Sequence, residues 1–517
     1  MKVKRLHLQN YGRFEDLKID FAPTAEKTGN VTVMVGNNGA GKSQVLQALA
    51  TGLSWFVNGL LYYSGENFSH IRNHSETILF PHEGEYVDQS RIMNNRNKVK
   101  LDLVFSDMYH ELKGLSISTT RKEVLKPAIY GTGDNGFNYL IGEYAKTFES
   151  NKKSNLPLIA NYTTDRNVEV DSIDASFSFL SDQLSAYTDF MSAGSNYDEF
   201  FQWFRDNEDV ENEINRDKVQ NQELNDIEIQ LYKLKNKKEV IEEIINDVET
   251  EREMSLYHSL SKIIADIDSK EIEINQLSIR SDVLAASVFK GFKSQLKHTK
   301  NAIEHFTNFK NVRIRRLNKP TMIVEKDGEE LDVNQLSQGE KSLLALVGDI
   351  ARRLALLNPS LDNPLEGEGV VMIDEVDLHL HPKWQHDLID KLVATFPNVQ
   401  FILTTHSPHV ISDRNDILLY SLDDGELTEM PNVYGEDANT VLTKIFDVDI
   451  RDSKVEEQFT IIRRAISKHD YVTAENCITE LAEKLPSDHL ELLKCRLLLA
   501  QSKLANSNTD EPSHAKD

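Results

Sequence analysis

The sequence predicts an α/β fold, in which a mostly parallel sheet is interrupted by an antiparallel helical hairpin and followed by an α-helical tail. The apolar run at 31–35 is typical of a strand buried on both faces, and a glycine-rich segment and a helical pattern follow it. From Ser195 to Lys290 the chain contains neither Gly nor Pro, and its apolar residues recur at steps of three and four. From about residue 310 short apolar strands again alternate with helices, and 455–504 reads as helix.

These patterns divide the chain into four parts. The expected parts are an N-terminal lobe at 1–205, a hairpin insertion at 206–300, a C-terminal lobe at 301–450 and a helical tail at 451–517. Strand-like stretches in the first lobe lie at 3–35, 98–125 and 157–162. The last dozen residues are polar, and we expect them to be disordered.

The hairpin is expected to consist of two long helices with heptad-like seams. One seam runs from Leu224 to Val248 and the other from Leu260 to Leu277, so the turn is expected at 254–259. A pair of ordinary amphipathic helices packed on the core is the alternative. The tail is expected to break near His469 and at Pro486.

Composition narrows the class of protein. The 517 residues include 58 Lys and Arg against 83 Asp and Glu, a net charge of −25, which argues against nonspecific coating of nucleic acid but leaves a local basic groove open. Cys477 and Cys495 form neither a disulfide framework nor a zinc ribbon, and we expect them in helix cores. The N-terminus lacks a secretory apolar segment, and the apolar stretch Leu49–Tyr63 is short and interrupted, so a cytoplasmic protein without a membrane span is expected.

The glycine-rich segment after the first buried strand fits G-x-x-x-x-G-K-[ST], the phosphate-binding P-loop (Walker A). Its residues are Gly36, Asn37, Asn38, Gly39, Ala40, Gly41, Lys42 and Ser43. Glycines let backbone amides curl around a phosphate at a helix N-terminus. Lys42 is expected to reach the β- and γ-phosphates of ATP, and the Ser43 hydroxyl to bind Mg²⁺.

A second apolar strand, 370–373, delivers two adjacent carboxylates to its C-terminal end (Walker B). Asp374 is placed to hold the magnesium shell, and Glu375 to polarise the attacking water as general base. The next apolar strand, 401–404, is soon followed by His406, which we place at the γ-phosphate. Asp377 lies between these two strands in the sequence.

The segment LSQGEK at 336–341 precedes an apolar helix. Ser337 and the Gly339 amide would lie at that helix N-terminus, either as a second anion site or as a plain N-cap. His379 and His381 have a spacing that puts both on one side of a strand. No Cys lies near them or near His406 and His409, so no metal other than Mg²⁺ is expected.

These motifs together resemble the ABC-type ATPases of the SMC and RecF group, including the opening hairpin LQNYGRFEDLKIDF. The resemblance implies that two heads sandwich two ATP molecules, so that Ser337 and Gly339 act on the nucleotide of the other copy, with Asp377 in the D-loop and His406 as the switch histidine. Gln89 is a candidate for the group's Q-loop glutamine. Arg13 either approaches the nucleotide or lies on the surface.

A narrower resemblance is to the PtuA ATPases of Septu and retron defence systems. It rests on the segments at 157–166, 374–385, 404–412 and 437–451. It implies a partner HNH nuclease (PtuB), a reverse transcriptase with its RNA–DNA product where the system is a retron, and contact with nucleic acid through the complex. The tail would then be either a cap on the head or a docking module for the nuclease.

Two other functions are considered: a RecF/RecN-like DNA-repair ATPase, and an OLD-like nuclease with a Toprim domain. Toprim chemistry needs spaced acidic pairs on a further α/β domain. Only about 110 residues follow His406, and Asp423-Asp424-Gly425 among them reads as a β-turn. The sequence therefore disfavours a Toprim domain.

Overall fold

The computed structural model describes most of the chain in two units. The described residues are 1–64, 86–106, 113–121, 128–130, 136–166, 183–193, 197–247, 253–278, 286–316, 320–412, 414–446, 453–486 and 488–507. The first unit is Met1–Tyr434 and the second is Gly435–Asp517. This division falls before the expected boundary at 450/451, because helix α10 (Ala438–Ile445) belongs to the second unit.

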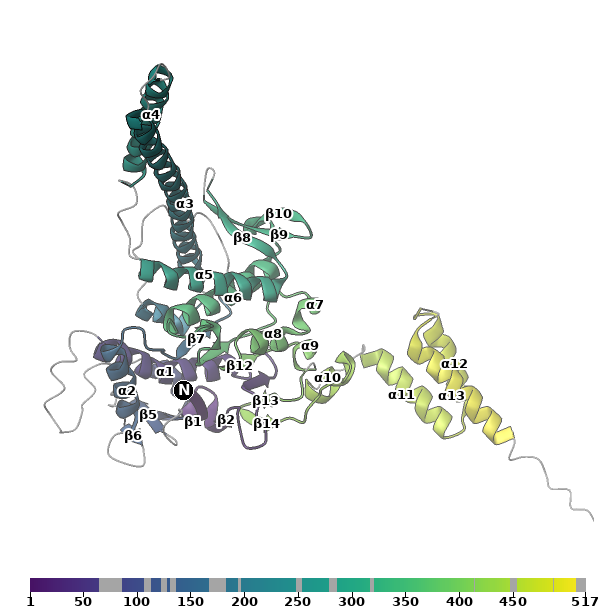
Figure 1. Cartoon of the computed structure of the whole chain (residues 1–517). Coiled ribbons are helices and arrows are strands. Elements are labelled where there is room, and N and C mark those ends of the chain that lie inside the picture. Colours follow the sequence, from purple (N-terminus) through teal and green to yellow (C-terminus); the bar gives the residue numbers. More distant parts are fainter. Residues whose placement is uncertain are drawn as a thin grey trace, which may run out of the picture. The chain divides into compact units, whose positions relative to one another are not determined.

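The central sheet of the first unit positions the motifs (Figure 1). Its order is β14-β13-β3-β12-β11-β7, and the bounds are β3 (Val31–Val35), β7 (Leu158–Tyr162), β11 (Gly369–Ile373), β12 (Val399–Thr404), β13 (Leu418–Asp423) and β14 (Glu426–Glu429). All neighbours are parallel except the β13–β14 pair. Every residue of β3, β7, β11 and β12 is buried, as expected of a parallel sheet covered on both faces. The segments that follow these strands therefore meet at one edge.

Two antiparallel sheets complete the first unit. The larger has the order β2-β1-β4-β5-β6, from strands β1 (Lys2–Tyr11), β2 (Phe14–Asp20), β4 (Lys98–Ser106), β5 (Lys113–Thr120) and β6 (Ala128–Tyr130). The smaller consists of β8 (Lys310–Arg315), β9 (Thr321–Lys326) and β10 (Glu329–Asp332). The buried Gln400 amide joins the larger sheet to β12, because it accepts from the Val3 N–H and donates to the Val3 carbonyl, each at 2.8 Å.

Helices pack around these sheets. Their bounds are α1 (Lys42–Ser64), α2 (Gly136–Ser150), α5 (Ala286–Thr307), α6 (Gln338–Leu357), α7 (Pro382–Gln385), α8 (Leu388–Thr395) and α9 (Pro408–Ile411), and the short 3₁₀ turns are η2 (Gln89–Arg91), η3 (Gln183–Tyr187), η4 (Phe190–Ser192), η5 (Val333–Gln335) and η6 (Pro364–Glu366). Helix α1 is apolar and long enough to cross a membrane by composition, but 78 % of its most apolar stretch is buried inside the protein. It is a core helix that contacts β4, β7 and β12.

The insertion is a helical pair formed by α3 (Asp198–Asp247) and α4 (Glu253–Ser278), which pack together (Figure 1). The prediction of a turn at 254–259 is wrong, because these residues lie inside α4. Helix α3 also begins earlier than the expected 206. Its first turns are buried in the head, where Gly348 leaves room for the Phe200 ring; a Cβ there would lie 2.3 Å from that ring.

The seam between α3 and α4 is narrower than the heptads predict. Ile227 and Ile267 are buried, Leu231 and Ile241 are half-buried, and Ile264 is 38 % exposed. The expected seam residues Leu224, Ile245, Val248 and Leu277 lie outside the part of the chain whose side chains the structure describes. A two-helix insertion has little interior, so most of its surface faces solvent.

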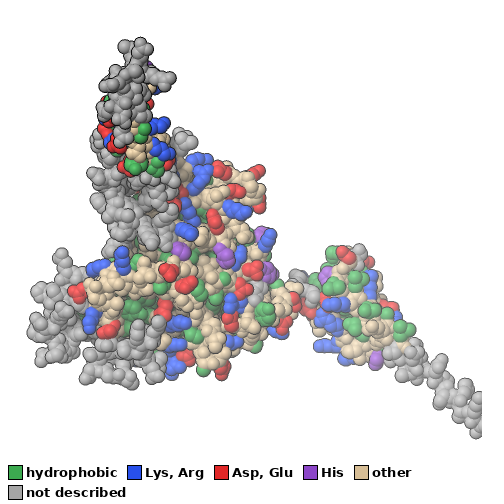
Figure 2. All heavy atoms as spheres, in the orientation of Figure 1, with side chains coloured by type: hydrophobic (Ala, Val, Ile, Leu, Met, Phe, Trp, Pro, Cys, Tyr) green, Lys and Arg blue, Asp and Glu red, His purple; other side chains and the backbone are tan. Residues whose placement is uncertain are grey.

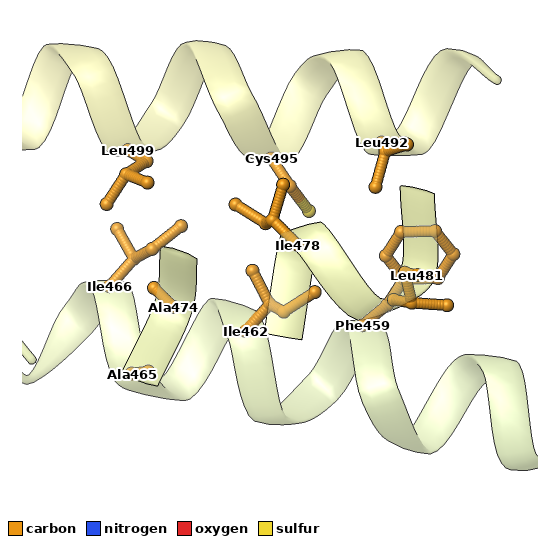
Figure 3. Close-up of a cluster of buried hydrophobic side chains, with 10 residues drawn as sticks. All are labelled: Phe459, Ile462, Ala465, Ile466, Ala474, Ile478, Leu481, Leu492, Cys495 and Leu499. Carbon is orange, nitrogen blue, oxygen red and sulfur yellow. The ribbon is translucent and has the colours of Figure 1, made fainter. Parts of the chain in front are cut away.

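The second unit has its own core (Figure 3). Helices α11 (Ser453–Ser467), α12 (Tyr471–Ala482) and α13 (Leu490–Ser507) are separated near His469 and Pro486, as predicted. Their shared core consists of Phe459, Ile462, Ala465, Ile466, Ala474, Ile478, Leu481, Leu492, Cys495 and Leu499. Cys477 packs against this core, so both cysteines have the expected structural setting. The terminal residues expected to be disordered lie outside the described part.

Candidate nucleotide-binding site

The P-loop joins β3 to α1, and its shape depends on glycine. Gly36, Gly39 and Gly41 have φ angles of 146°, 77° and 109°. A Cβ on Gly36 would lie 2.0 Å from the Leu422 carbonyl oxygen, and one on Gly41 would lie 2.4 Å from the Phe14 ring. Larger residues at these two positions would collide with neighbouring strands, so the loop is built as a cradle of backbone amides.

Lys42 folds back over this loop. Its Nζ donates to the carbonyls of Gly36 at 2.8 Å and Asn37 at 3.2 Å. Burial lowers the pKa of the Lys42 ammonium, while the nearby carboxylates of Asp374 and Glu375 act to raise it. A phosphate would take the place of the two carbonyls as the partner of this cation, so the residues present fit a nucleotide phosphate.

Arg13 lies against the P-loop from the β1–β2 hairpin. Its guanidinium donates to the Gly39 carbonyl and approaches the Asp424 carboxylate at 3.3 Å. Arg13 is thus an exposed residue that lies beside the loop, and its approach to the nucleotide stays a prediction. Gln89, the Q-loop candidate, is exposed at the start of η2 and does not line the cavity at the P-loop.

Asp374 and Glu375 follow β11 directly. The Thr404 hydroxyl, from β12, donates to Asp374 Oδ1 at 2.5 Å and accepts from the Glu375 N–H at 2.7 Å. Glu375 has a φ of 46°, a left-handed conformation that costs about 1–2 kcal/mol in a residue other than glycine. Asp377 accepts a hydrogen bond from Thr405 Oγ1 at 2.5 Å, so Thr404 at the end of β12 and Thr405 directly after it contact all three residues.

The predicted catalytic groups meet at one cavity. It is lined by Asn38, Gly39, Gly41, Lys42, Ser43, Gln44, Glu375 and His406. Burial lowers the pKa of the His406 imidazole, and the Lys42 charge lowers it further, which favours the neutral ring. A carboxylate, a cation and an imidazole thus line the cavity at the loop that would hold the phosphates.

Ser337 is the N-cap of α6 and forms a capping box with Glu340. The Ser337 hydroxyl donates to Glu340 Oε2 at 2.8 Å, and the Glu340 N–H points back to that hydroxyl. Gly339 packs on the His379 carbonyl, from which a Cβ would lie only 2.3 Å away. In the single chain Ser337 is therefore an N-cap, as one of the two alternatives predicts. A bound anion would lie at the same end of α6.

Ser337 and Gly339 line a second cavity, which shares none of its lining residues with the cavity at the P-loop. Its lining residues are Lys326, Ser337, Gln338, Gly339, Glu340, His379, Leu380, His381 and Trp384. The strand geometry expected for His379 and His381 is wrong. His379 lies in a turn with φ 64°, and His381 is the N-cap of α7. Among the residues that the structure describes, no group of three or more His, Cys, Asp or Glu side chains could hold a metal ion.

The roles of Thr404 and Arg166 at this site were not predicted, and neither was Gln44, which lines the cavity. Thr404 was read only as the last residue of a strand, and Arg166 only as part of a segment shared with other ATPases. Arg166 is 4 % exposed, and its guanidinium donates to the carbonyls of Asp374 and Glu375. A polar residue at the end of a buried strand or shortly after it was the available signal for both, because such residues gather at one edge of a parallel sheet.

Residues 1–411, most of the chain, match the protein family described as "AAA ATPase domain". The chain belongs to this family. The AAA ATPase is also 32 % identical over 501 residues to a protein named retron Ec83 probable ATPase from Escherichia coli, an alignment that covers 94 % of this chain and 82 % of that protein. It is 30 % identical to the retron Vc95 probable ATPase of Vibrio cholerae serotype O1 biovar El Tor, over 80 % of this chain and 71 % of the relative.

A shorter match of the AAA ATPase is to the Septu protein PtuA of Bacillus thuringiensis, with 32 % identity over 25 % of this chain and 34 % of that protein. The predicted PtuA and retron type of ATPase is thereby confirmed. Among solved structures, an Smc head domain of Pyrococcus furiosus with an extended coiled coil gives a TM-score of 0.39 and 14 % identity, covering 83 % of this chain and 96 % of that one. A similar Smc head domain of Pyrococcus yayanosii gives a TM-score of 0.40 and 14 % identity, over 85 % and 98 % of the two chains.

Proposed function

We propose that the P-loop edge of the central sheet hydrolyses ATP to ADP and phosphate with Mg²⁺. The observation that carries this is the meeting of Lys42, Ser43, Glu375 and His406 at one cavity. Lys42 and the loop amides bind the phosphates, and Ser43 and Asp374 hold the metal. Mg²⁺, when bound, neutralises charge that develops on the phosphate oxygens.

In this proposal Glu375 accepts a proton from the attacking water. The neutral His406 lies beside the γ-phosphate, where it can donate a hydrogen bond without adding a charge. The Asp374 carboxylate keeps one oxygen for the metal while its other oxygen is held by Thr404.

The site is completed by a second copy of the chain. Ser337 and Gly339 line their own cavity, and no residue is common to it and to the P-loop cavity. This separation supports an arrangement in which the end of α6 of one copy meets the nucleotide held by the other. The binding of ATP would then favour association of two heads, and hydrolysis would release them.

We propose further that the ATPase controls an HNH nuclease partner of the PtuB type in bacterial defence against phage. Support comes from relatives named for retrons and for Septu, similar over most of the chain in the retron cases. In a retron, a reverse transcriptase with its RNA–DNA product would be a further partner. Nucleic acid would be contacted through the complex, which agrees with the mixed acidic and basic side chains on the face of the head seen in Figure 2. The compartment is the cytoplasm.

Co-expression with an HNH nuclease of the PtuB type tests the control function. We expect the two proteins to co-purify, and phage protection to be lost with Lys42→Ala while co-purification persists. The matched control is Lys18→Ala, an exposed lysine of β2. Full protection by Lys42→Ala, or protection without any nuclease, would contradict the proposal.

A further inference from the structure

Arg166 is a buried arginine that holds the backbone of the two Walker B acids. It lies four residues after the end of β7. One guanidinium nitrogen, Nη2, donates to the Asp374 carbonyl at 2.8 Å and to the Glu375 carbonyl at 2.7 Å. A single nitrogen therefore fixes two consecutive carbonyls, and with them the peptide that joins the two acids.

Glu375, on one side of this peptide, is one of the non-glycine residues with a left-handed backbone. Glu375 has a φ of 46°, and its N–H donates to the Thr404 hydroxyl. Arg166 holds the carbonyl side of Glu375 while Thr404 holds its amide side. A strained residue persists only where its surroundings fix it, and these two contacts come from the segments on opposite sides of β11.

The strain has a consequence for the side chain. In its left-handed conformation Glu375 lines the P-loop cavity together with Ser43 and His406. Relaxation of the backbone to an ordinary φ would swing Cβ, and the carboxylate with it, to another direction. Whatever holds the backbone of Glu375 therefore also aims its carboxylate.

Packing alone does not explain an arginine at this position. Burial lowers the pKa of Arg166, against the attraction of Tyr197 and the nearby acids, and its Nε has no hydrogen-bond partner among the residues that the structure describes. A buried cation with an unsatisfied donor is costly, and apolar residues of similar volume often replace buried charges without loss of stability. The hydrogen bonds to the two carbonyls, in contrast, need a donor at this position, which an apolar side chain of the same size would not supply.

We propose that Arg166 is a positioning residue for ATP hydrolysis, which keeps the Asp374–Glu375 peptide in the conformation that points Glu375 at the attacking water. The proposal rests on the role of Glu375 as general base. It predicts that Arg166 acts on catalysis through Glu375 and has little influence on the binding of ATP, which depends on the P-loop.

The test measures kcat and the Kd for ATP in four full-length proteins: wild type, Arg166→Met, Glu375→Gln and the double variant. We expect Arg166→Met to lower kcat about 10–100-fold, as loss of a supporting contact to an active-site group usually does, with the Kd within about twofold of wild type. In the Glu375→Gln background the same substitution should have no further effect, because the carboxylate that Arg166 aims is absent. Arg166→Lys keeps a donor and should recover part of kcat.

The matched control is Arg205→Met, which removes another buried arginine, one that pairs with Asp206 on α3. It should leave kcat unchanged. An equal fall in kcat in both backgrounds would overturn the positioning role, as would wild-type kcat in Arg166→Met. If Arg166→Met proves insoluble, Arg166→Lys decides alone: a fall in kcat only where Glu375 is present supports the proposal, and an unchanged kcat overturns it. Wild-type kcat in Glu375→Gln alone would instead refute the general base.

Discussion

The Thr404 hydroxyl lies between the two Walker B acids and makes one hydrogen bond to each: it donates to Asp374 Oδ1 at 2.5 Å and accepts from the Glu375 N–H at 2.7 Å. The parallel register of β11 and β12, which pairs Ile373 with Leu403, puts Thr404 opposite the end of β11. One hydroxyl on the neighbouring strand thus orients both Asp374, the proposed metal-binding acid, and the backbone of Glu375, the proposed general base.

Thr404→Val should weaken Mg²⁺ binding. Valine has the same shape but leaves the Asp374 carboxylate free to rotate and the Glu375 amide without a partner. Partners of metal-binding groups typically contribute about 10–100-fold to metal affinity or activity, so the Mg²⁺ concentration for half-maximal ATPase activity should rise by about that factor. A Mg²⁺ titration of activity measures it, with Thr428→Val on β14 as control. An unchanged Mg²⁺ dependence would contradict this role of Thr404.

A buried charge cluster beside the site should make stability depend on acid pH. Burial alone would raise the pKa of Asp349 on α6, but the charges of Arg353 and Arg352 and hydrogen bonds from Arg353 and Tyr162 lower it to about 2, from an ordinary 3.8. The unfolded chain therefore binds the proton first as the pH falls. The stability that ionised Asp349 contributes is fully present above about pH 4 and is lost towards pH 2, by about 2 kcal/mol.

Asp349→Asn reveals this contribution, because it leaves two buried arginines without their counter-charge. At pH 7 we expect the variant to be destabilised by about 3–5 kcal/mol, and the difference from wild type to shrink between about pH 4 and pH 2. Denaturant unfolding across this pH range is the measurement, with the exposed Asp209→Asn as control. A difference that stays constant with pH would mean that Asp349 is not ionised in the folded protein.

The sequence was sufficient to predict the parts of this protein that depend on local pattern. Buried strands such as 370–373 are short apolar runs, and the P-loop has a fixed spacing of glycines. The contacts of Arg166 and Thr404 could not be predicted in this way, because they depend on which strands become neighbours in the sheet. The strand order places β12 and β7 on either side of β11, although β7 precedes it by about 200 residues.

The errors have a similar cause. Residues 254–259 contain no helix-breaking residue, and the apolar spacing alone could not show that α4 starts before them. In the tail, the buried and the exposed apolar residues recur at the same helical spacing, so the spacing could not distinguish core from surface. Ile462 and Ile478 are buried in the core of the second unit, whereas Leu490, Leu493 and Leu497 are exposed. Burial depends on the packing of α11, α12 and α13 on one another.

The division of the tail's apolar residues into a buried core and exposed leucines predicts what the tail does. A chain ending at Arg451 loses the whole core of α11–α13 but no residue of the P-loop site, so ATP binding should be unchanged. We expect it to lose co-purification with the HNH partner. Leu493→Glu with Leu497→Glu is the sharper variant, because both side chains are on the surface, where apolar groups of the second unit are visible (Figure 2). Val472→Glu on α12, 70 % exposed, is the control. Retention of the partner at full stoichiometry by the double variant would refute docking through α13.

The action of Ser337 across two copies has its own test. Ser337→Arg should leave ATP binding by a single head intact, because Ser337 does not line the P-loop cavity, while preventing association of heads. Mixing Ser337→Arg with Lys42→Ala should restore part of the ATPase activity that each variant lacks, since one of the two composite sites is then formed by the unaltered P-loop of one copy and the unaltered signature of the other. Loss of ATP binding by Ser337→Arg in separated heads would show that this residue acts within its own chain.

The central claim is that Glu375 is the general base of an ATPase site at the edge of the central sheet, and single-turnover ATP hydrolysis by Glu375→Gln tests it most directly. The amide keeps the size and the hydrogen-bonding backbone of the residue but cannot accept the proton from water. We predict an unchanged Kd for ATP, a rate lowered by about 10²–10⁴-fold, and accumulation of the ATP-bound dimer. Hydrolysis at the wild-type rate by this variant would contradict the account.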